Sequence, residues 1–492
     1  MKKKLRGAVV PMIAVDREDT RPLHRQIYDA FRSMILERRL EPGQRIPSTR
    51  ALGADLGISR IPVLDAYAQL LAEGYIESQP GAGTYVTSSL PDQTITAATS
   101  TSPIKHQPHR AVSDASNKLS VKLPWLYRSG AFSVGELAYD HFPFRIWSQL
   151  ITRHVRRTSA SSMNYSDPMG LKEFREVIAA YLRTARAAHC DASQIMVVNG
   201  SQQALSLAAR VLHEAGSGVW VEEPSYVLLR DALTLAGCRL VPVPVDNEGL
   251  NVAAGMKLAK RARAAFVTPS HQYPLGVTMS VTRRLELLDW ANRFDSWIVE
   301  DDYDSEYRYE SMPIACLQGL DLASRVIYIG TFSKTLFPAL RLGYIVIPPA
   351  LVDRFLAVRR ASDLCPAHLY QAALADFISE GHFAAHIRRT KRLYSERRSA
   401  LVEALRRELS GEIEILGAEA GMHLVVTLPS GVSDVAISQK AAQEGLWLWP
   451  LSRTYLGKNV RPGFILGFGS TKAEEMPREV RRLRRFLAKE SG

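Results

Sequence analysis

The chain has 492 residues and a formal net charge of +12 at neutral pH, so it is too long for one ordinary hydrophobic core and should form at least two domains. Its charged fraction of 23% and hydrophobic fraction of 46% exclude a disordered or fibrous class. No apolar run approaches the roughly 18 residues of a membrane span, and Pro11 interrupts the short apolar stretch near the N-terminus, so we expect a cytoplasmic protein without a signal peptide.

Residues 20–87 carry the pattern of a small helical module. An apolar residue recurs at every fourth position from Leu23 to Ile35, which predicts one stripe of an amphipathic helix. Ser48 is expected to cap a short second helix that ends at Gly57, and Ser59 to cap a third helix after that tight turn. The segment "YIESQPGAGTYV" then predicts two strands around a Pro/Gly turn.

Three helices with a short turn between the second and third, followed by a β-hairpin, indicate a winged helix-turn-helix rather than a general helical interaction domain. The segment "PGQRIPSTRALGADLGISRIPVLDAYAQLLAEGYIESQPGAGTYV" resembles the GntR family over nearly its whole length. The resemblance implies that the third helix reads double-stranded operator DNA. The candidate DNA contacts are Arg50, Ser59 and Arg60, with Gly83 letting the wing approach a phosphate backbone. Ile61 and Pro62 stand where GntR proteins more often have polar residues, which leaves the base readout open.

Residues 88–122 contain no aromatic residue and are rich in Ser and Thr, with Pro scattered through them. Such a segment buries too little apolar area to order itself, so it is expected to be a flexible linker. It separates the N-terminal module from a body of residues 123–490. The basic excess of the chain is spread over both parts, so charge alone does not locate the DNA-binding domain.

The body predicts an α/β fold. Strand-like runs such as "QIMVVNG", "AAFVTPS", "SWIVEDD" and "RVIYIGTFSK" alternate with helical runs such as "SQQALSLAARVL" and "VTRRLELLDWANRF". Parallel strands place functional loops at their carboxyl ends, and each of these runs ends in residues suited to chemistry.

The ends of those strands together favour a pyridoxal phosphate site. One run ends at a helix N-terminus able to bind a phosphate, a second ends in carboxylates able to hold a protonated pyridine nitrogen, and a third ends at Lys334, which can form an imine. The candidates for the phosphate are Gly200, Ser201, Gln202, Ser333 and Arg341.

Neither a metal site nor a disulfide framework is expected. The four cysteines lie far apart without a Cys-X-X-Cys pair, which is typical of reduced thiols. His382 and His386 lie one helical turn apart, but no acidic base of the HExxH type lies between them.

Residues 123–470 resemble the fold-type I aminotransferases of class I, and the whole chain is similar to the MocR/GabR family of pyridoxal phosphate-dependent transcriptional regulators. The resemblance rests on the ordered set "YSDPMGLKEFREVIAAYL", "EEPSY", "TPSHQYPLG", "EDDYDSEYRY" and "GTFSKTLFPALRLGY". It implies a large domain with a mainly parallel sheet, a smaller C-terminal α/β subdomain, and a homodimer.

The resemblance also assigns roles at the cofactor. Lys334 should form the imine, and Asp301 should pair with the pyridine nitrogen, with Asp302 as the alternative because spacing alone does not separate the two neighbours. Tyr303 should hydrogen-bond the phenolic oxygen of the cofactor, and Tyr226 should stack on its ring. Two residues should line the side of the same oxygen, namely Gln272 and Tyr273.

The group that would bind an effector carboxylate is less evident. Aminotransferases use an arginine near the C-terminal strand, but this strand offers Leu466 at the expected place, so Arg453 and Arg461 are the substitutes. Two functions remain open. The favoured one is a regulator that senses pyridoxal phosphate or an amine or amino-acid effector, and the other is an active aminotransferase with an accessory N-terminal domain.

Overall fold

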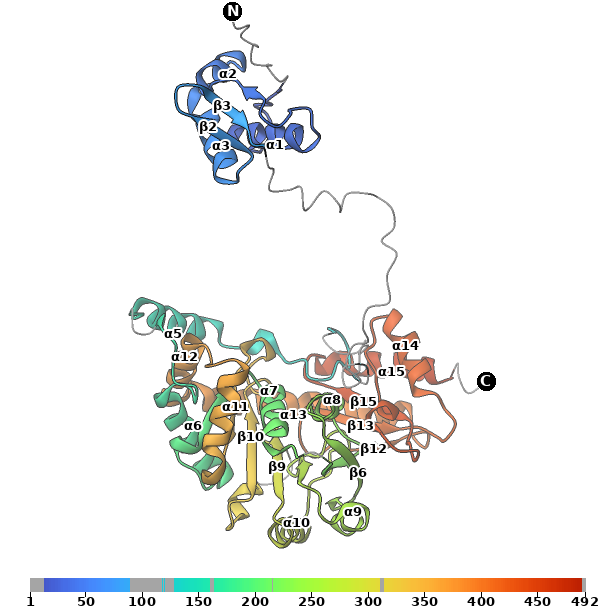
Figure 1. The fold of residues 1–492 in the computed structure, drawn as a ribbon. Coiled ribbons are helices and arrows are strands. Elements are labelled where there is room, and N and C mark those ends of the chain that lie inside the picture. The colour runs from blue at the N-terminus through green and yellow to red at the C-terminus, as the bar shows by residue number, and fades with distance from the viewer. Residues whose placement is uncertain are drawn as a thin grey trace, which may run out of the picture. The chain divides into compact units, whose positions relative to one another are not determined.

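The computed structural model describes residues 13–88, 117, 119, 128–159, 163–214, 216–309 and 314–488. The chain divides into two compact units, residues 1–111 and 112–492, and Figure 1 shows the fold of each. Most of the expected linker, residues 88–122, lies outside the described residues.

The N-terminal unit contains the three expected helices and the expected hairpin. The helices are α1 (Leu23–Leu36), α2 (Thr49–Asp55) and α3 (Arg60–Ala72). Strands β2 (Ile76–Gln79) and β3 (Gly83–Val86) form the wing, and β1 (Arg45–Ile46) pairs with β3 to give an antiparallel sheet of order β1-β3-β2. The two-residue strand β1 was not predicted, because it is too short to show a periodic pattern.

The N-caps of α2 and α3 differ from each other. The Ser48 side chain accepts a hydrogen bond from the Ala51 amide and caps α2, as predicted. Ser59 occupies the N-cap position of α3, but its side chain makes no capping hydrogen bond, so the predicted cap is wrong in this respect. The hydroxyl group of Ser59 is exposed at the start of α3.

The helices of this unit close on a small core. Phe31 of α1 packs edge-on against Tyr67 of α3, with ring centroids 5.4 Å apart. The buried hydroxyl group of Tyr67 donates to the Pro47 carbonyl at 2.9 Å. This bond fixes α3 against the chain segment that precedes α2, so the two helices of the helix-turn-helix hold one geometry.

The second unit is built on an eight-stranded sheet of order β4-β11-β10-β9-β8-β5-β6-β7. Its strands are β4 (Ile195–Val198), β5 (Gly218–Glu223), β6 (Arg239–Asp246), β7 (Gly249–Leu250), β8 (Ala264–Val267), β9 (Trp297–Asp302), β10 (Val326–Thr331) and β11 (Gly343–Val346). Strands β5, β6, β8, β9 and β10 run parallel, while β11 runs antiparallel to both β4 and β10. The carboxyl ends of β4, β5, β8, β9 and β10 therefore meet at one edge.

Helices cover both faces of this sheet (Figure 1). Because successive side chains of a strand point to opposite faces, Ile195 and Val197 pack with α5 (Phe144–Arg156), α6 (Lys172–Arg186) and α12 (His368–Ser379). Met196 and Val198 pack on the other face with α7 (Ser201–Leu212), α8 (Val227–Leu235) and α11 (Val352–Ser362). Helices α9 (Val252–Ala259) and α10 (Val281–Arg293) cover strands β5, β6, β8 and β9.

The C-terminal part forms a smaller sheet of order β12-β13-β15-β14, which is antiparallel throughout. Its strands are β12 (Glu414–Leu416), β13 (His423–Thr427), β14 (Trp449–Pro450) and β15 (Gly463–Gly467). The helices are α13 (His382–Glu408), α14 (Asp434–Gln443) and α15 (Met476–Ala488). Among the described helices, none combines the length and the apolar composition needed to cross a bilayer.

Candidate functional site

Three of the predicted groups follow strands that end at the same edge of the large sheet. Gly200 lies after β4, Asp301 lies near the end of β9, and Lys334 lies three residues after β10. Asp301 is paired in register with Ile329 of β10, the strand that leads to Lys334. The fold thus brings together residues that are more than 130 positions apart in the sequence.

The amine of Lys334 lies against the backbone of Gly135. A Cβ atom on Gly135 would lie 2.4 Å from Nζ, and the φ of this glycine is +84°. Burial lowers the pKa of Lys334 below its usual range, and the nearby carboxylates of Asp304 and Asp301 oppose this shift. A lysine with a lowered pKa is more often uncharged, which is the form that attacks a carbonyl.

The two neighbouring aspartates have different surroundings. Asp302 is buried, and its Oδ2 lies 2.9 Å and 2.7 Å from Nε and Nη2 of Arg186 and accepts a hydrogen bond of 2.6 Å from the hydroxyl group of Tyr328. Oδ1 of Asp301 is buried without a hydrogen-bond partner among the described residues. Burial, with the charges of Asp302 and Asp304, raises the pKa of Asp301 to about 7. Asp301 therefore presents an unsatisfied acceptor.

The start of α7 and Arg341 form a positively polarised end of the site. Gly200 is the N-cap of α7 with a φ of +87°, and a Cβ atom there would lie 3.2 Å from Nη1 of Arg341. Nη2 of Arg341 donates to the Asn199 carbonyl at 2.5 Å. A guanidinium group and the free amides of a helix N-terminus together suit a phosphate.

Among the other three phosphate candidates, Ser201 is the first residue of α7, and Gln202 and Ser333 have local hydrogen-bond partners. The carboxamide of Gln202 donates to the Leu228 carbonyl at 2.8 Å. The Ser333 amide donates to the hydroxyl group of Thr331 at 3.1 Å, while the Ser333 hydroxyl makes no hydrogen bond within the described part of the chain.

Three tyrosines surround the space next to Asp301. Tyr226 and Tyr273 meet edge-on with ring centroids 5.5 Å apart, and Tyr273 meets Tyr303 edge-on at 6.1 Å. Tyr226 and Tyr273 line a small cavity together with Asp301 and Ser225. The hydroxyl group of Tyr303 lies 3.0 Å from Nδ1 of His271.

Gln272 lies in a buried hydrogen-bond network beside this space. Its Nε2 lies 2.9 Å from the Pro224 carbonyl and 3.2 Å from a carboxylate oxygen of Glu222, and its Oε1 accepts from the Leu275 amide at 3.0 Å. The side chain is buried. Its carboxamide is thus occupied in holding the loop after β8 against the end of β5.

The arginines expected near an effector carboxylate are surface residues. Arg461 pairs with Glu414 at 2.8 Å, and 50% and 61% of the two side chains are exposed. Arg453 is exposed as well. Leu466 lies in the core of the C-terminal part, while its neighbour Ile465 packs on the opposite face with Leu275.

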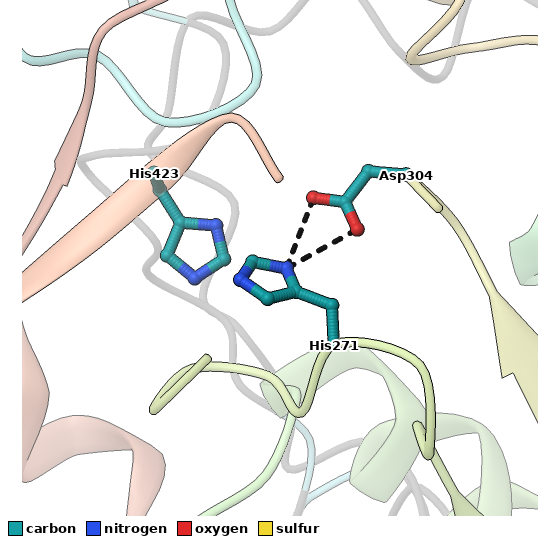
Figure 2. Close-up of side chains that lie close together, drawn as sticks. All are labelled: His271, Asp304 and His423. Carbon is teal, nitrogen blue, oxygen red and sulfur yellow. Dashed lines mark hydrogen bonds and ion pairs between the residues drawn. The ribbon is translucent and has the colours of Figure 1, made fainter. Parts of the chain in front are cut away.

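A cluster of His271, Asp304 and His423 was not predicted from the sequence (Figure 2). Nδ1 of His271 lies 3.2 Å from both carboxylate oxygens of Asp304, all three residues are buried, and one ligand atom from each lies within 4.8 Å of the others. His271 and Asp304 stand inside the motifs "TPSHQYPLG" and "EDDYDSEYRY", but His423 begins a distant strand and carries no local signal. The histidines considered earlier differ, because His386 is buried and bonded to the Thr335 carbonyl while His382 pairs with Glu380.

The DNA candidates lie on the surface of the N-terminal unit. Arg50, Ser59 and Arg60 are exposed at the starts of α2 and α3, and Nε of Arg60 donates to the hydroxyl group of Thr49 at 3.0 Å. Gly83 has a φ of +118°, and a Cβ atom there would lie 2.9 Å from Nε of Arg45. Gly83 thus leaves room for the side chain of Arg45, a cation of β1 beside the wing that was not predicted as a DNA contact.

Comparisons with known proteins match the same two parts. The family "Aminotransferase class I and II" matches residues 131–465, and the family "Bacterial regulatory proteins, gntR family" matches residues 23–86. The probable rhizopine catabolism regulatory protein MocR of Rhizobium meliloti is 41% identical over 488 residues, which cover 98% of this chain and 97% of that protein. The HTH-type pyridoxine biosynthesis transcriptional regulator PdxR of Corynebacterium glutamicum is 30% identical over 461 residues, covering 93% and 94%.

Solved structures match the second unit. The kynurenine aminotransferase of Pyrococcus horikoshii, crystallised in complex with PMP, superimposes with a TM-score of 0.71 at 27% identity. The match covers 77% of this chain and 97% of that one.

Proposed function

This chain belongs to the aminotransferase class I and II family and carries a GntR-family domain at its N-terminus, and from this premise we propose that it is a transcriptional regulator that senses an amine through its cofactor. The cofactor of the family is pyridoxal phosphate. The body would then receive the signal through its cofactor, and the N-terminal domain would respond through its binding to DNA.

The residues at the edge of the sheet fit this cofactor. The amine of Lys334 would join it covalently, and the α7 N-terminus with Arg341 would bind its phosphate. Tyr226 would stack on the ring, and Tyr303 would donate to the phenolic oxygen. When bound, pyridoxal phosphate supplies a ring that withdraws electrons from an attached amine.

The observation that carries the proposal is the unsatisfied Oδ1 of Asp301. A buried acceptor without a partner costs about 1–3 kcal/mol, and a protonated pyridine nitrogen is the kind of donor that would remove this cost. Asp302 already has Arg186 and Tyr328 as partners. We therefore assign the pyridine nitrogen to Asp301.

Sensing requires that a ligand bind two states of the protein unequally. An amine that displaces Lys334 from the cofactor changes the contacts of the site, and this change would alter operator affinity if only one state holds both DNA-binding domains in register. An amine or an amino acid would act in this way, and pyridoxal phosphate itself would act by occupying the site.

Borohydride reduction followed by peptide mapping tests the cofactor assignment. The cofactor should remain on the peptide that contains Lys334, and the Lys334→Ala protein should carry no label. Label on another lysine of the wild-type protein would contradict the assignment.

A second candidate function is an active aminotransferase with an accessory N-terminal domain. It is supported by Lys334 and Asp301, which lie at the ends of neighbouring strands and would permit amine exchange on a bound cofactor. Steady-state assays with amines and keto acids distinguish the two, because a regulator needs one exchange per response while an enzyme of this class turns over at about 1–1000 per second.

A further inference from the structure

The solvent-facing side of α3 is apolar at its start. Among the described residues of the N-terminal unit, the exposed large hydrophobic side chains are Ile61, Leu64 and Leu71, and all three belong to this helix. Ile61 is 67% exposed and Leu64 is 41% exposed. Because these two residues are three positions apart, they are neighbours on one helix face, while Val63 and Tyr67 point into the core. The unit thus presents a small apolar surface at the first turns of α3.

Cations lie next to this apolar surface. Arg60 precedes Ile61 in the sequence, and its Nε donates to the hydroxyl group of Thr49 at 3.0 Å, which ties the start of α3 to the start of α2. Arg50, the residue after Thr49, is exposed as well. Asp65 is the one acidic residue of α3. Two arginines beside a small apolar surface are suited to a polyanion that also offers apolar groups.

The place of Ile61 in the helix-turn-helix brings it to the bases of a bound duplex. In this motif the second helix enters the major groove, and the residues at its N-terminus meet the base edges. Here α2 and α3 are the two helices, and Ile61 is the second residue of α3. In the first two turns of α3 and at its N-cap, the exposed side chains able to form hydrogen bonds are Ser59, Arg60 and Asp65. An apolar contact therefore accounts for part of the base reading.

An isoleucine at a base edge favours thymine over the other three bases. The C5-methyl group of thymine is the apolar group that the bases present in the major groove. Against another base, Ile61 would remove water from hydrogen-bonding groups without replacing their hydrogen bonds, which costs free energy. A β-branched side chain on a helix has one strongly preferred rotamer, so the contact also orders little side-chain freedom.

A protein is the other class of partner that an apolar surface can bind. A stable protein interface buries about 800 Å² of each partner and involves about 20 residues on each side. The surface at the start of α3 consists of two large apolar side chains, Ile61 and Leu64, with Arg60 beside them. Its small area and the adjacent positive charge favour DNA over a protein.

We propose that Ile61, with Leu64 beside it, contacts the C5-methyl group of a thymine in the major groove and thereby specifies thymine at one operator position. The inference rests on the proposed function, because it requires that the N-terminal unit bind operator DNA. It adds an apolar residue to the contacts that select the operator sequence.

Replacement of thymine by uracil tests this contact, because it removes the methyl group and leaves the hydrogen-bonding groups of the base in place. The operator is first selected from a pool of random duplexes by the full-length protein, with and without pyridoxal phosphate. Each thymine of the selected operator is then replaced in turn by uracil. At the contacted thymine, the affinity of the wild-type protein should fall about fourfold, which is the effect of exposing one methyl group.

Three variants locate the contact on the protein. Ile61→Ala should bind the thymine and uracil operators equally, whereas Ile61→Val, which keeps a branched apolar side chain, should retain most of the difference. Leu71→Ala is the matched control. Leu71 is 40% exposed and lies two turns beyond Leu64 on the same face of α3, about 15 Å along the helix from Ile61. Leu71→Ala should therefore keep the fourfold ratio. Because both positions are exposed, none of these changes opens a cavity in the core.

The outcomes separate this inference from the proposed function. A wild-type affinity that uracil leaves unchanged at every thymine overturns the inference, while operator binding stands. The same fourfold ratio in Ile61→Ala and in Leu71→Ala overturns it too. If Ile61→Ala keeps its operator affinity but changes the mass measured by light scattering, the surface binds a protein and the inference is wrong. If selection yields no preferred duplex under either condition, the proposed function fails and the inference with it.

Discussion

The adjacent carboxylates of Asp301 and Asp302 differ in their hydrogen-bond partners, and this difference separates their proposed roles. The sequence "EDDYD" located the pair but could not separate Asp301 from Asp302, because adjacent strand residues point to opposite faces and the partners lie far along the chain. Arg186 of α6 and Tyr328 of β10 donate hydrogen bonds to Asp302, whereas one carboxylate oxygen of Asp301 has no partner among the described residues. Lys334 was predicted from its place after a strand, whereas His423 could not be, since only the fold brings it to His271.

The raised pKa of Asp301 predicts a pH-dependent effect of Asp301→Asn in the cofactor-free protein. A carboxyl group whose pKa rises from 3.8 to about 7 on folding stabilises the fold while it is protonated, and this contribution is lost progressively as the pH rises from about 4 to about 7. The variant should therefore gain stability relative to wild type between pH 5 and pH 8, by about 3 kcal/mol.

Urea unfolding followed by tryptophan fluorescence measures this effect, because all seven tryptophans lie in the body. Asp302→Asn is the matched control. It removes one partner of a buried ion pair and should destabilise the body at both pH values by about 3–5 kcal/mol. A difference between Asp301→Asn and wild type that does not change with pH would contradict the assignment.

The backbone of Gly135 leaves room for the amine of Lys334. Gly135→Ala places a Cβ atom 2.4 Å from the resting position of Nζ of Lys334, so the amine must move and cofactor affinity should fall. Gly381 has a similar φ of +82° with no atom within 4 Å of its Cβ position. Gly381→Ala should show only the strain of a left-handed residue, about 1–2 kcal/mol of stability, with unchanged cofactor affinity. Equal cofactor affinity in both variants would show that Gly135 does not position the amine.

At the scale of elements, apolar patterns predicted α1, α3, the wing and four strands of the large sheet, β4, β8, β9 and β10. They missed β1, which has two residues, and the exposed hydroxyl of Ser59 at the start of α3. The C-terminal subdomain was expected only from the family resemblance. Its strands have two to five residues and are separated by loops, so they show little periodic pattern in the sequence.

The starts of α2 and α3 carry the predicted DNA contacts. If Arg50 or Arg60 contacts a base edge, its replacement by alanine should cost about 1–3 kcal/mol and relax specificity at one operator position. A phosphate contact should instead weaken all sequences and lower the salt slope by about 1. Arg39→Ala is the control, because Arg39 is an exposed arginine of the same unit that pairs with Glu37. Binding by both variants that equals that of Arg39→Ala at every salt concentration would remove these arginines from the interface.

The whole molecule is proposed to act as a homodimer. Exposed apolar side chains occur at Phe144, Met163 and Tyr165 of the body, where a partner subunit would cover them. Light scattering should give a mass near twice 54.7 kDa. A monomer at micromolar concentration would contradict the dimer, and Tyr165→Glu should shift the equilibrium toward monomers by placing a charge in the interface.

Lys334 is proposed to couple cofactor binding to DNA binding, and one titration tests this coupling most directly. Operator affinity is measured for wild-type and Lys334→Ala proteins with and without pyridoxal phosphate and a panel of amines. Coupling of this kind is typically 1–3 kcal/mol, so wild-type affinity should change by about 5- to 150-fold, while Lys334→Ala should bind the operator with an affinity that no ligand alters. A wild-type affinity that is indifferent to every ligand, together with sustained turnover of amines to keto acids, would contradict the account and favour an aminotransferase.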